Sequence, residues 1–93
     1  MDERFIIETN ENNIRHELLV RVVREQRKPS GLVDLLVECE RGTLPIGGSL
    51  NYPSDIGQFW LVQTGGNVFE GVLGYNEPWV FRIVDDEQED EMD

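Results

Sequence analysis

Cysteine and histidine are almost absent from this 93-residue sequence, which contains only Cys39 and His16. A lone thiol cannot form an internal disulfide, and one Cys with one His falls short of the four ligands of a structural zinc site. We therefore expect no metal site and no cofactor. We interpret Cys39 as a small packed hydrophobe, and His16 as a solvated or half-packed side chain.

Long apolar runs and catalytic motifs are also missing. Without an apolar run of about twenty residues or a charged-then-apolar leader, we expect no membrane span, no signal peptide and hence a cytoplasmic protein. The phosphate-binding pattern Gly-x-x-x-x-Gly-Lys-Ser/Thr is absent, and no serine or cysteine lies in a motif that would activate it as a nucleophile. We therefore predict no catalytic residues and do not expect an enzyme.

Positive charge is scarce, because nineteen acidic residues oppose eight Lys and Arg and give a formal net charge of -11 at pH 7. This imbalance opposes binding to nucleic acids and anionic membranes, and it favours a basic protein partner. The charges are also segregated. Seven carboxylates fall in residues 85–93, which we expect to form a disordered acidic tail after a single domain of residues 1–84. Five basic residues form what we call the basic patch: Arg15, Arg21, Arg24, Arg27 and Lys28.

The stretch Gly31–Tyr52 predicts two strands joined by a tight reversal. Its first strand is expected over Leu32–Glu40, and Arg41–Gly42 offers the positive φ that a reversal requires. Gly47–Gly48 then interrupts the second strand, which resumes at Leu50.

Residues 14–28 fit two different templates. On a helix, Ile14, Leu18 and Val22 would share one face, and a preceding asparagine could cap the first turn. On a strand, Leu18, Val20 and Val22 would share one face, and the high valine content favours this template. We prefer the strand and keep the helix as the alternative.

Turn signals divide the rest of the sequence into short segments rich in aromatic and β-branched residues. Strands are predicted at residues 4–9, 58–64, 68–75 and 79–84, and turns or loops at 10–13, 29–31, 51–57, 65–67 and 76–78. Together these segments predict an all-β fold, namely a small antiparallel β-barrel or a strongly bent sheet of six or seven strands. The alternative is an α+β fold with one helix at about residues 13–28.

The central stretch also carries a family resemblance. Its relevant residues are Gly31, Val37, Glu40, Arg41, Gly42, Thr43, Leu44, Ile46, Gly47 and Leu50. A Gly-led strand that ends in Arg-Gly-Thr, followed by an apolar residue, a Gly and another strand, resembles the second-domain β-barrel of translation elongation factors. The resemblance implies a small barrel that binds RNA or a translation component. It does not imply GTP hydrolysis, since the phosphate-binding loop is absent.

Two functions from different classes fit these features. Small size, acidity and the lack of a catalytic motif favour a binding protein of the inhibitor or immunity type, which would cover a basic surface of a partner such as a nuclease-type toxin. The alternative is a stand-alone translation-factor-like barrel that binds RNA or a translation component through the basic patch. For the first function, the candidate partner-binding residues are Trp79, Glu77, Asp85, Asp86 and Glu87. Trp79 follows a proline at a strand entry, where it could anchor an interface, although core packing is the preferred role for it.

Overall fold

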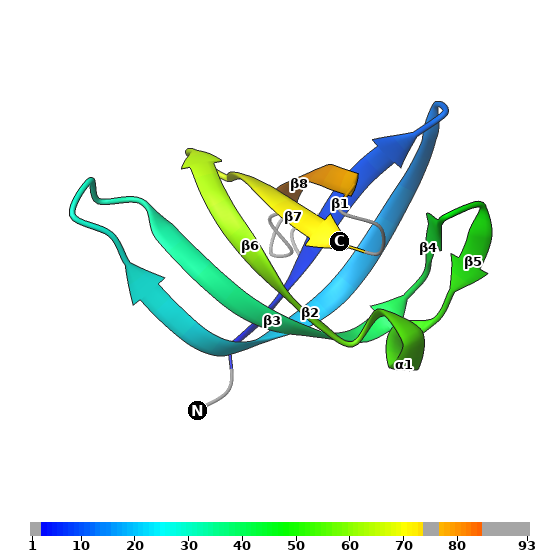
Figure 1. The fold of residues 1–93 in the computed structure, drawn as a ribbon, viewed down its shortest axis with the longest axis horizontal. Helices are drawn as coiled ribbons and strands as arrows, with labels where there is room; N and C mark the ends of the chain where they lie inside the picture. Colours follow the sequence, from blue (N-terminus) through cyan, green and yellow to red (C-terminus); the bar gives the residue numbers. More distant parts are fainter. Residues whose placement is uncertain (1–2, 74–76, 85–93) are drawn as a thin grey trace, which may run out of the picture.

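Six strands close into an antiparallel barrel, which confirms the predicted fold class. The computed structural model of the chain describes residues 3–73 and 77–84. The strand order around the barrel is β1-β2-β3-β6-β7-β8, and two further short strands form a separate hairpin, β4-β5 (Figure 1). The strands are β1 (Arg4–Glu11), β2 (Ile14–Arg27), β3 (Val33–Gly42), β4 (Leu44–Ile46), β5 (Ser49–Asn51), β6 (Gln58–Gly65), β7 (Val68–Leu73) and β8 (Glu77–Val84).

The segment with two possible templates is a strand, so the helix alternative is wrong. Leu18 and Val20 of β2 are fully buried, whereas their neighbours point outwards, as a period of two requires. β2 pairs with β1 on one side and with β3 on the other. A helix would have placed Val20 away from the buried stripe, and the barrel would have lost its longest strand.

The β2-β3 hairpin extends past the end of β1, and we call residues 23–27 of β2, which have β3 as their one partner strand among the described residues, the ribbon. A register shift between Val22 and Arg24 leaves Val23 as an extra residue, and such a bulge increases the local bend. Residues 23–27 beyond it are exposed. The ribbon turns at residues 28–31, as predicted, and Val33 N–H donates to the Gln63 Oε1 of β6 (2.9 Å).

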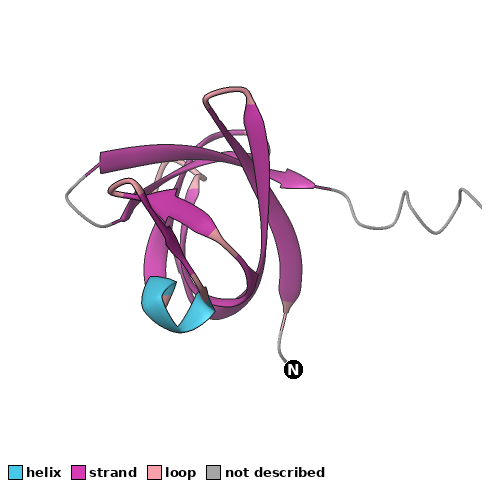
Figure 2. Cartoon of the chain, turned by 90° about the vertical axis from the view of Figure 1, so that its right-hand side faces the viewer, coloured by secondary structure: helices cyan, strands magenta, loops and turns pink. Residues whose placement is uncertain are grey.

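The barrel interior holds one hydrophobic core, because each strand directs alternate residues inwards. Leu44 of β4 and Ile56 of α1 (Pro53–Ile56) add to the core beside the β4-β5 hairpin, and Figure 2 shows α1 next to this hairpin. The core residues are Ile7, Leu18, Val20, Leu35, Val37, Cys39, Leu44, Ile56, Phe59, Leu61, Phe69, Leu73, Trp79 and Phe81. The interpretation of Cys39 as a packed hydrophobe is therefore confirmed.

The predicted reversal at Arg41–Gly42 is wrong. Both residues continue β3 and pair with Leu18 and Leu19 of β2. Gly42 does have a positive φ of 111°, but it serves a close crossing of two backbones, since a Cβ there would lie 2.3 Å from the Glu17 carbonyl oxygen. The reversal comes later, at Gly47–Gly48, which joins β4 to β5.

Two smaller expectations also need correction. The predicted loop 51–57 contains the single helical turn α1, in which Ile56 N–H donates to the Tyr52 carbonyl (2.9 Å) and Pro53 takes an early position that needs no N–H. The β6-β7 turn begins one residue later than predicted, at Gly66 with its positive φ of 56°, because Gly65 still belongs to β6 and pairs with Val68. Among the described residues, no helix has the length and apolar character needed to cross a membrane.

Candidate binding surfaces

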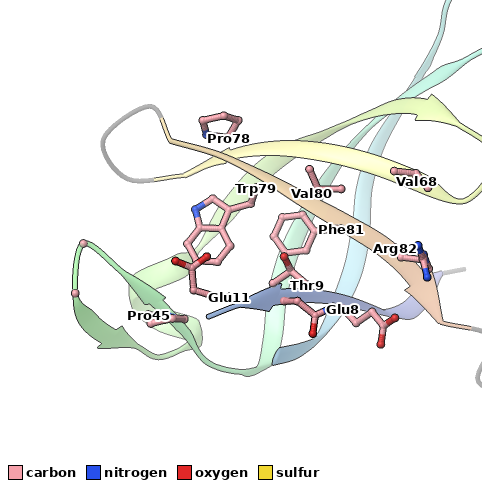
Figure 3. Close-up of a pocket in the computed structure, with 13 residues that line it drawn as sticks. Glu8, Thr9, Glu11, Pro45, Val68, Pro78, Trp79, Val80, Phe81 and Arg82 are labelled. Atoms are coloured by element: carbon pink, nitrogen blue, oxygen red, sulfur yellow. The ribbon is translucent and has the colours of Figure 1, made fainter. Parts of the chain in front are cut away.

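The barrel is closed by a short seam between β1 and β8. These strands pair only at Ile6 with Val84, Ile7 with Ile83 and Glu8 with Arg82, although each strand is eight residues long. Beyond the last of these pairs the two strands diverge (Figure 3). The rest of β1 and the first half of β8 therefore have a partner strand on one side only.

A hollow of about 690 Å³ fills the space where β1 and β8 separate. We call it the seam hollow. Thr9, Trp79 and Phe81 form its inner wall, and the turn of the β4-β5 hairpin borders it. The Trp79 and Phe81 rings are stacked with their centroids 6.5 Å apart. Figure 3 shows both aromatic side chains pointing from β8 towards β1, with Glu11 on the β1 side of the hollow.

Two residues that line the seam hollow carry polar groups without partners among the described residues. The Trp79 side chain is buried, with the residue only 6% exposed, and its indole Nε1–H has no hydrogen-bond acceptor among the described residues. A buried donor in that state loses its bond to water without replacement. Glu11 also lines the hollow and forms no ion pair within the described part of the chain, whereas Glu8 contacts Arg15 (2.6 Å).

Main-chain groups of β8 also point into the seam. Ile83 N–H donates to the Asn67 carbonyl (2.9 Å), so the odd-numbered residues of β8 bond towards β7. Because antiparallel ladders alternate, the N–H and C=O of Val80 point towards the β1 side. Pro78 is on the same side, where its missing N–H removes no ladder bond, as is usual for a proline at a sheet edge.

The facing edge of β1 has the same property. Val22 N–H donates to the Glu3 carbonyl (2.8 Å), so the odd-numbered residues of β1 bond towards β2. The N–H and C=O of Asn10 therefore point towards β8. The seam hollow thus lies between two strand edges that present main-chain donors and acceptors to each other without touching.

A second candidate surface covers the outside of β3, β6, β7 and β8. Across these strands the register aligns Asp34, Val62, Glu70 and Val80, and beside them Leu36 pairs with Trp60 and Val72 with Pro78. The exposed fractions are 37% for Trp60, 38% for Val62, 56% for Val72 and 57% for Val80. We call these four residues, with half-buried Leu36, the apolar face.

The basic patch is largely neutralised by carboxylates of the barrel itself. Arg15 contacts Glu8 and Glu17, Arg21 contacts Glu38 and Glu40, Arg27 contacts Glu25 and Lys28 contacts Asp34. Within the described ranges, Arg24 is the one member of the patch without an ion pair. The patch therefore offers far less free positive charge than the sequence suggested.

Two titratable groups near this patch have shifted pKa values. A hydrogen bond from Arg4 Nε (2.7 Å), and then the nearby Arg21, lower the pKa of the Glu40 carboxyl. Burial raises the pKa of the Cys39 thiol, and a backbone hydrogen bond with Arg41 offsets this effect only in part. A buried thiol with little thiolate is a poor nucleophile and a poor metal ligand.

Only two of the five candidate partner-binding residues, Trp79 and Glu77, belong to the described part of the chain. Trp79 is a core residue that also lines the seam hollow, and Glu77 begins β8. Asp85, Asp86 and Glu87 lie outside the described residues. Sequence reasoning missed the apolar face. The alternation of buried Phe59 and Leu61 around Trp60 was the signal that could have placed this tryptophan outside.

His16 is half-buried in β2, and no group of three or more His, Cys, Asp or Glu side chains in the described ranges could hold a metal ion. In comparisons with known proteins, no family model, no curated protein and no solved structure matches this chain.

Proposed function

We propose that this chain is a small acidic protein-binding module that docks on a basic partner, in the manner of an inhibitor or immunity-type protein, in the cytoplasm. The observation that carries the proposal is the apolar face, which includes a tryptophan and spans four neighbouring strands. Contiguous exposed apolar patches of this kind are typical of interaction sites on small proteins.

The composition of the apolar face suits a protein interface. Tryptophan is among the residues most often found as interface hot spots, and Trp60 sits between Leu36 and Val62 on a regular sheet that holds it in place. A four-strand row is roughly 15 Å wide at the usual strand spacing, which is enough for the centre of an ordinary interface.

The charge around the apolar face favours a basic partner. Glu70 lies in register between Val62 and Val80 and forms no ion pair among the described residues. The net charge of -11 would speed the encounter with a positively charged protein at low salt. A partner such as a nuclease, whose own surface must attract phosphate, has the complementary charge.

The alternative function is a translation-factor-like barrel that binds RNA or a translation component. The barrel fold is compatible with this function, and Arg24 offers one free positive charge. The pairing of the other four basic side chains with Glu and Asp weighs against it, because phosphate contacts require unpaired Lys or Arg.

Affinity capture with matched variants tests the proposed function. We would immobilise the parent protein, a Trp60→Ser variant and a Val23→Ser control, in which an exposed valine (41%) is removed from the ribbon. We expect a basic protein that binds the parent and the control, is lost with Trp60→Ser, and elutes as salt is raised. Retention of the same proteins by all three baits would contradict the proposal. Salt-sensitive binding of a labelled single-stranded RNA, unaffected by Trp60→Ser, would instead support the alternative.

A further inference from the structure

We propose that the seam hollow is a strand-addition site, which takes an extended basic peptide segment of a protein partner between β1 and β8. This inference rests on the proposed function only in taking the partner to be a protein. It assigns a different site, because the residues that carry it lie on the diverging edges of the barrel.

The first argument is the state of the two strand edges. The main-chain N–H and C=O of Val80 and of Asn10 point into the seam, and no strand of the described part of the chain occupies the space between them. Exposed edges of this kind are templates for an added strand, which supplies the missing main-chain bonds. β1 and β8 already pair at Glu8 and Arg82, so an added strand would begin where their own ladder stops.

The second argument is the buried indole of Trp79. Trp79 lines the hollow, and its buried Nε1–H has no acceptor among the described residues, whereas every peptide unit of an incoming strand carries a carbonyl that could accept it. Aromatic walls next to a few unpaired polar groups are also typical of ligand sites. The hollow of about 690 Å³ is within the size range of such sites.

The third argument is the charge at the two ends of the hollow. Glu11, at the open end, has no ion-pair partner in the described ranges, whereas Arg82 belongs to the last β1-β8 pair, at the closed end. A lysine or arginine of the added strand would therefore face Glu11. A partner segment with basic residues agrees with the overall charge of -11.

The seam hollow also joins the apolar face. Pro78 and Val80 line the hollow and at the same time lie on the outside of β8. A partner that covers the apolar face could therefore insert one of its segments into the seam without a break in the interface.

A synthetic peptide provides the test. The probe is an eight-residue peptide with blocked ends that alternates valine with lysine or threonine, titrated into ¹⁵N-labelled protein. The control is the same peptide N-methylated at alternate amides, which keeps its charge but removes its main-chain donors on one edge. We expect saturable shifts of the Trp79 indole N–H and of the Val80 and Asn10 amides. The control should bind at least tenfold more weakly.

Variants make the test specific. Trp79→Phe keeps an aromatic ring but removes the indole N–H, and it should weaken peptide binding severalfold, whereas Trp60→Phe should not. If Trp79→Phe fails to fold, Glu11→Gln decides instead, because this side chain is exposed. Glu11→Gln should weaken peptide binding more than the matched Glu70→Gln on the apolar face.

Several outcomes would overturn the inference. The inference fails if the two peptides bind with equal affinity, or if Glu11→Gln and Glu70→Gln reduce peptide affinity equally. Either result would show that charge attraction alone holds the peptide. Shifts confined to Trp60 and its neighbours would place the peptide on the apolar face. If the peptide does not bind but Trp60-dependent capture of a partner persists, the strand-addition site fails and the proposed function stands. If the peptide binds the seam but no captured partner depends on Trp60, the strand-addition site stands and the proposed function through the apolar face fails.

Discussion

Gly42→Ala tests the close crossing of β3 over β2, and its effect can be worked out from the structure. A Cβ at this position would lie 2.3 Å from the Glu17 carbonyl oxygen, 2.8 Å from Leu18 Cδ2 and 3.0 Å from Leu18 Cα. Two of these three contacts involve main-chain atoms, so no side-chain rotation relieves them. The strands would have to separate at the point where Gly42 pairs with Leu18.

The expected cost has two parts. An L-residue with the φ of 111° found at Gly42 costs about 1–2 kcal/mol, reduced somewhat by the lower entropy of the unfolded alanine chain. Displacing β3 from β2 weakens ladder hydrogen bonds and loosens the packing of fully buried Leu18, which adds about 2–3 kcal/mol. We expect a total of about 3–4 kcal/mol, a large fraction of the stability of a small domain.

Gly31→Ala is the matched control, because Gly31 has a similar φ of 97° but no atom within 4 Å of the added Cβ. It should cost only the conformational part. Urea unfolding at 25 °C, followed by tryptophan fluorescence, measures both variants against the parent protein. Equal destabilisation by the two substitutions would refute the steric crossing and leave φ as the whole explanation.

Three further predictions concern the core and the titratable groups. Val20→Asp should destabilise the barrel by more than about 3 kcal/mol in the same urea assay, since Val20 is fully buried. Val23→Asp on the ribbon should change the free energy of unfolding little, and similar effects of the two substitutions would contradict the strand register. Cys39 should react slowly with a thiol reagent in the folded protein, and faster as pH rises. Because its pKa is raised, the folded state retains the proton, so the free energy of unfolding should fall as pH rises above the ordinary thiol pKa. Labelling of the native protein as fast as that of the unfolded protein would contradict this prediction. An NMR titration should give the Glu40 carboxyl a pKa below that of an ordinary glutamate, and this pKa should rise in Arg4→Gln. Because the pKa is lowered in the folded state, the carboxylate stabilises the fold above the ordinary carboxyl pKa, and this stabilisation is lost as pH falls through the folded pKa.

Local patterns were sufficient to predict most of the strands. The alternation of Leu18, Val20 and Val22 and the turn signals around the β2-β3 and β6-β7 hairpins depend on neighbouring residues, and the structure bears them out. The role of Gly42 could not be predicted in this way. The need for a glycine here comes from the close Glu17 backbone, which is distant in sequence and becomes a neighbour only after β2 and β3 pair.

The candidate surfaces were harder to predict than the strands. Trp60 and Trp79 both occur in apolar strand sequences, and only the sheet register shows that one faces outwards and the other inwards. The ion pairs of the basic patch are formed largely across strands, so a linear count of charges overstated its free charge. The divergence of β1 and β8 depends on how the barrel closes, for which the sequence contains no local signal.

The short seam between β1 and β8 has a consequence for the order of folding. Its three residue pairs join segments that are nearly the whole chain apart, whereas β1-β2, β2-β3, β6-β7 and β7-β8 are hairpins of neighbouring strands. Contacts so distant in sequence carry the largest loop-closure cost and form late. Closure of the cylinder should thus be the last step of folding and its reversal the first step of unfolding, with a curved open sheet as the species in between. Amide protons of Ile6 and Glu8 should then exchange with deuterium before those of Val37.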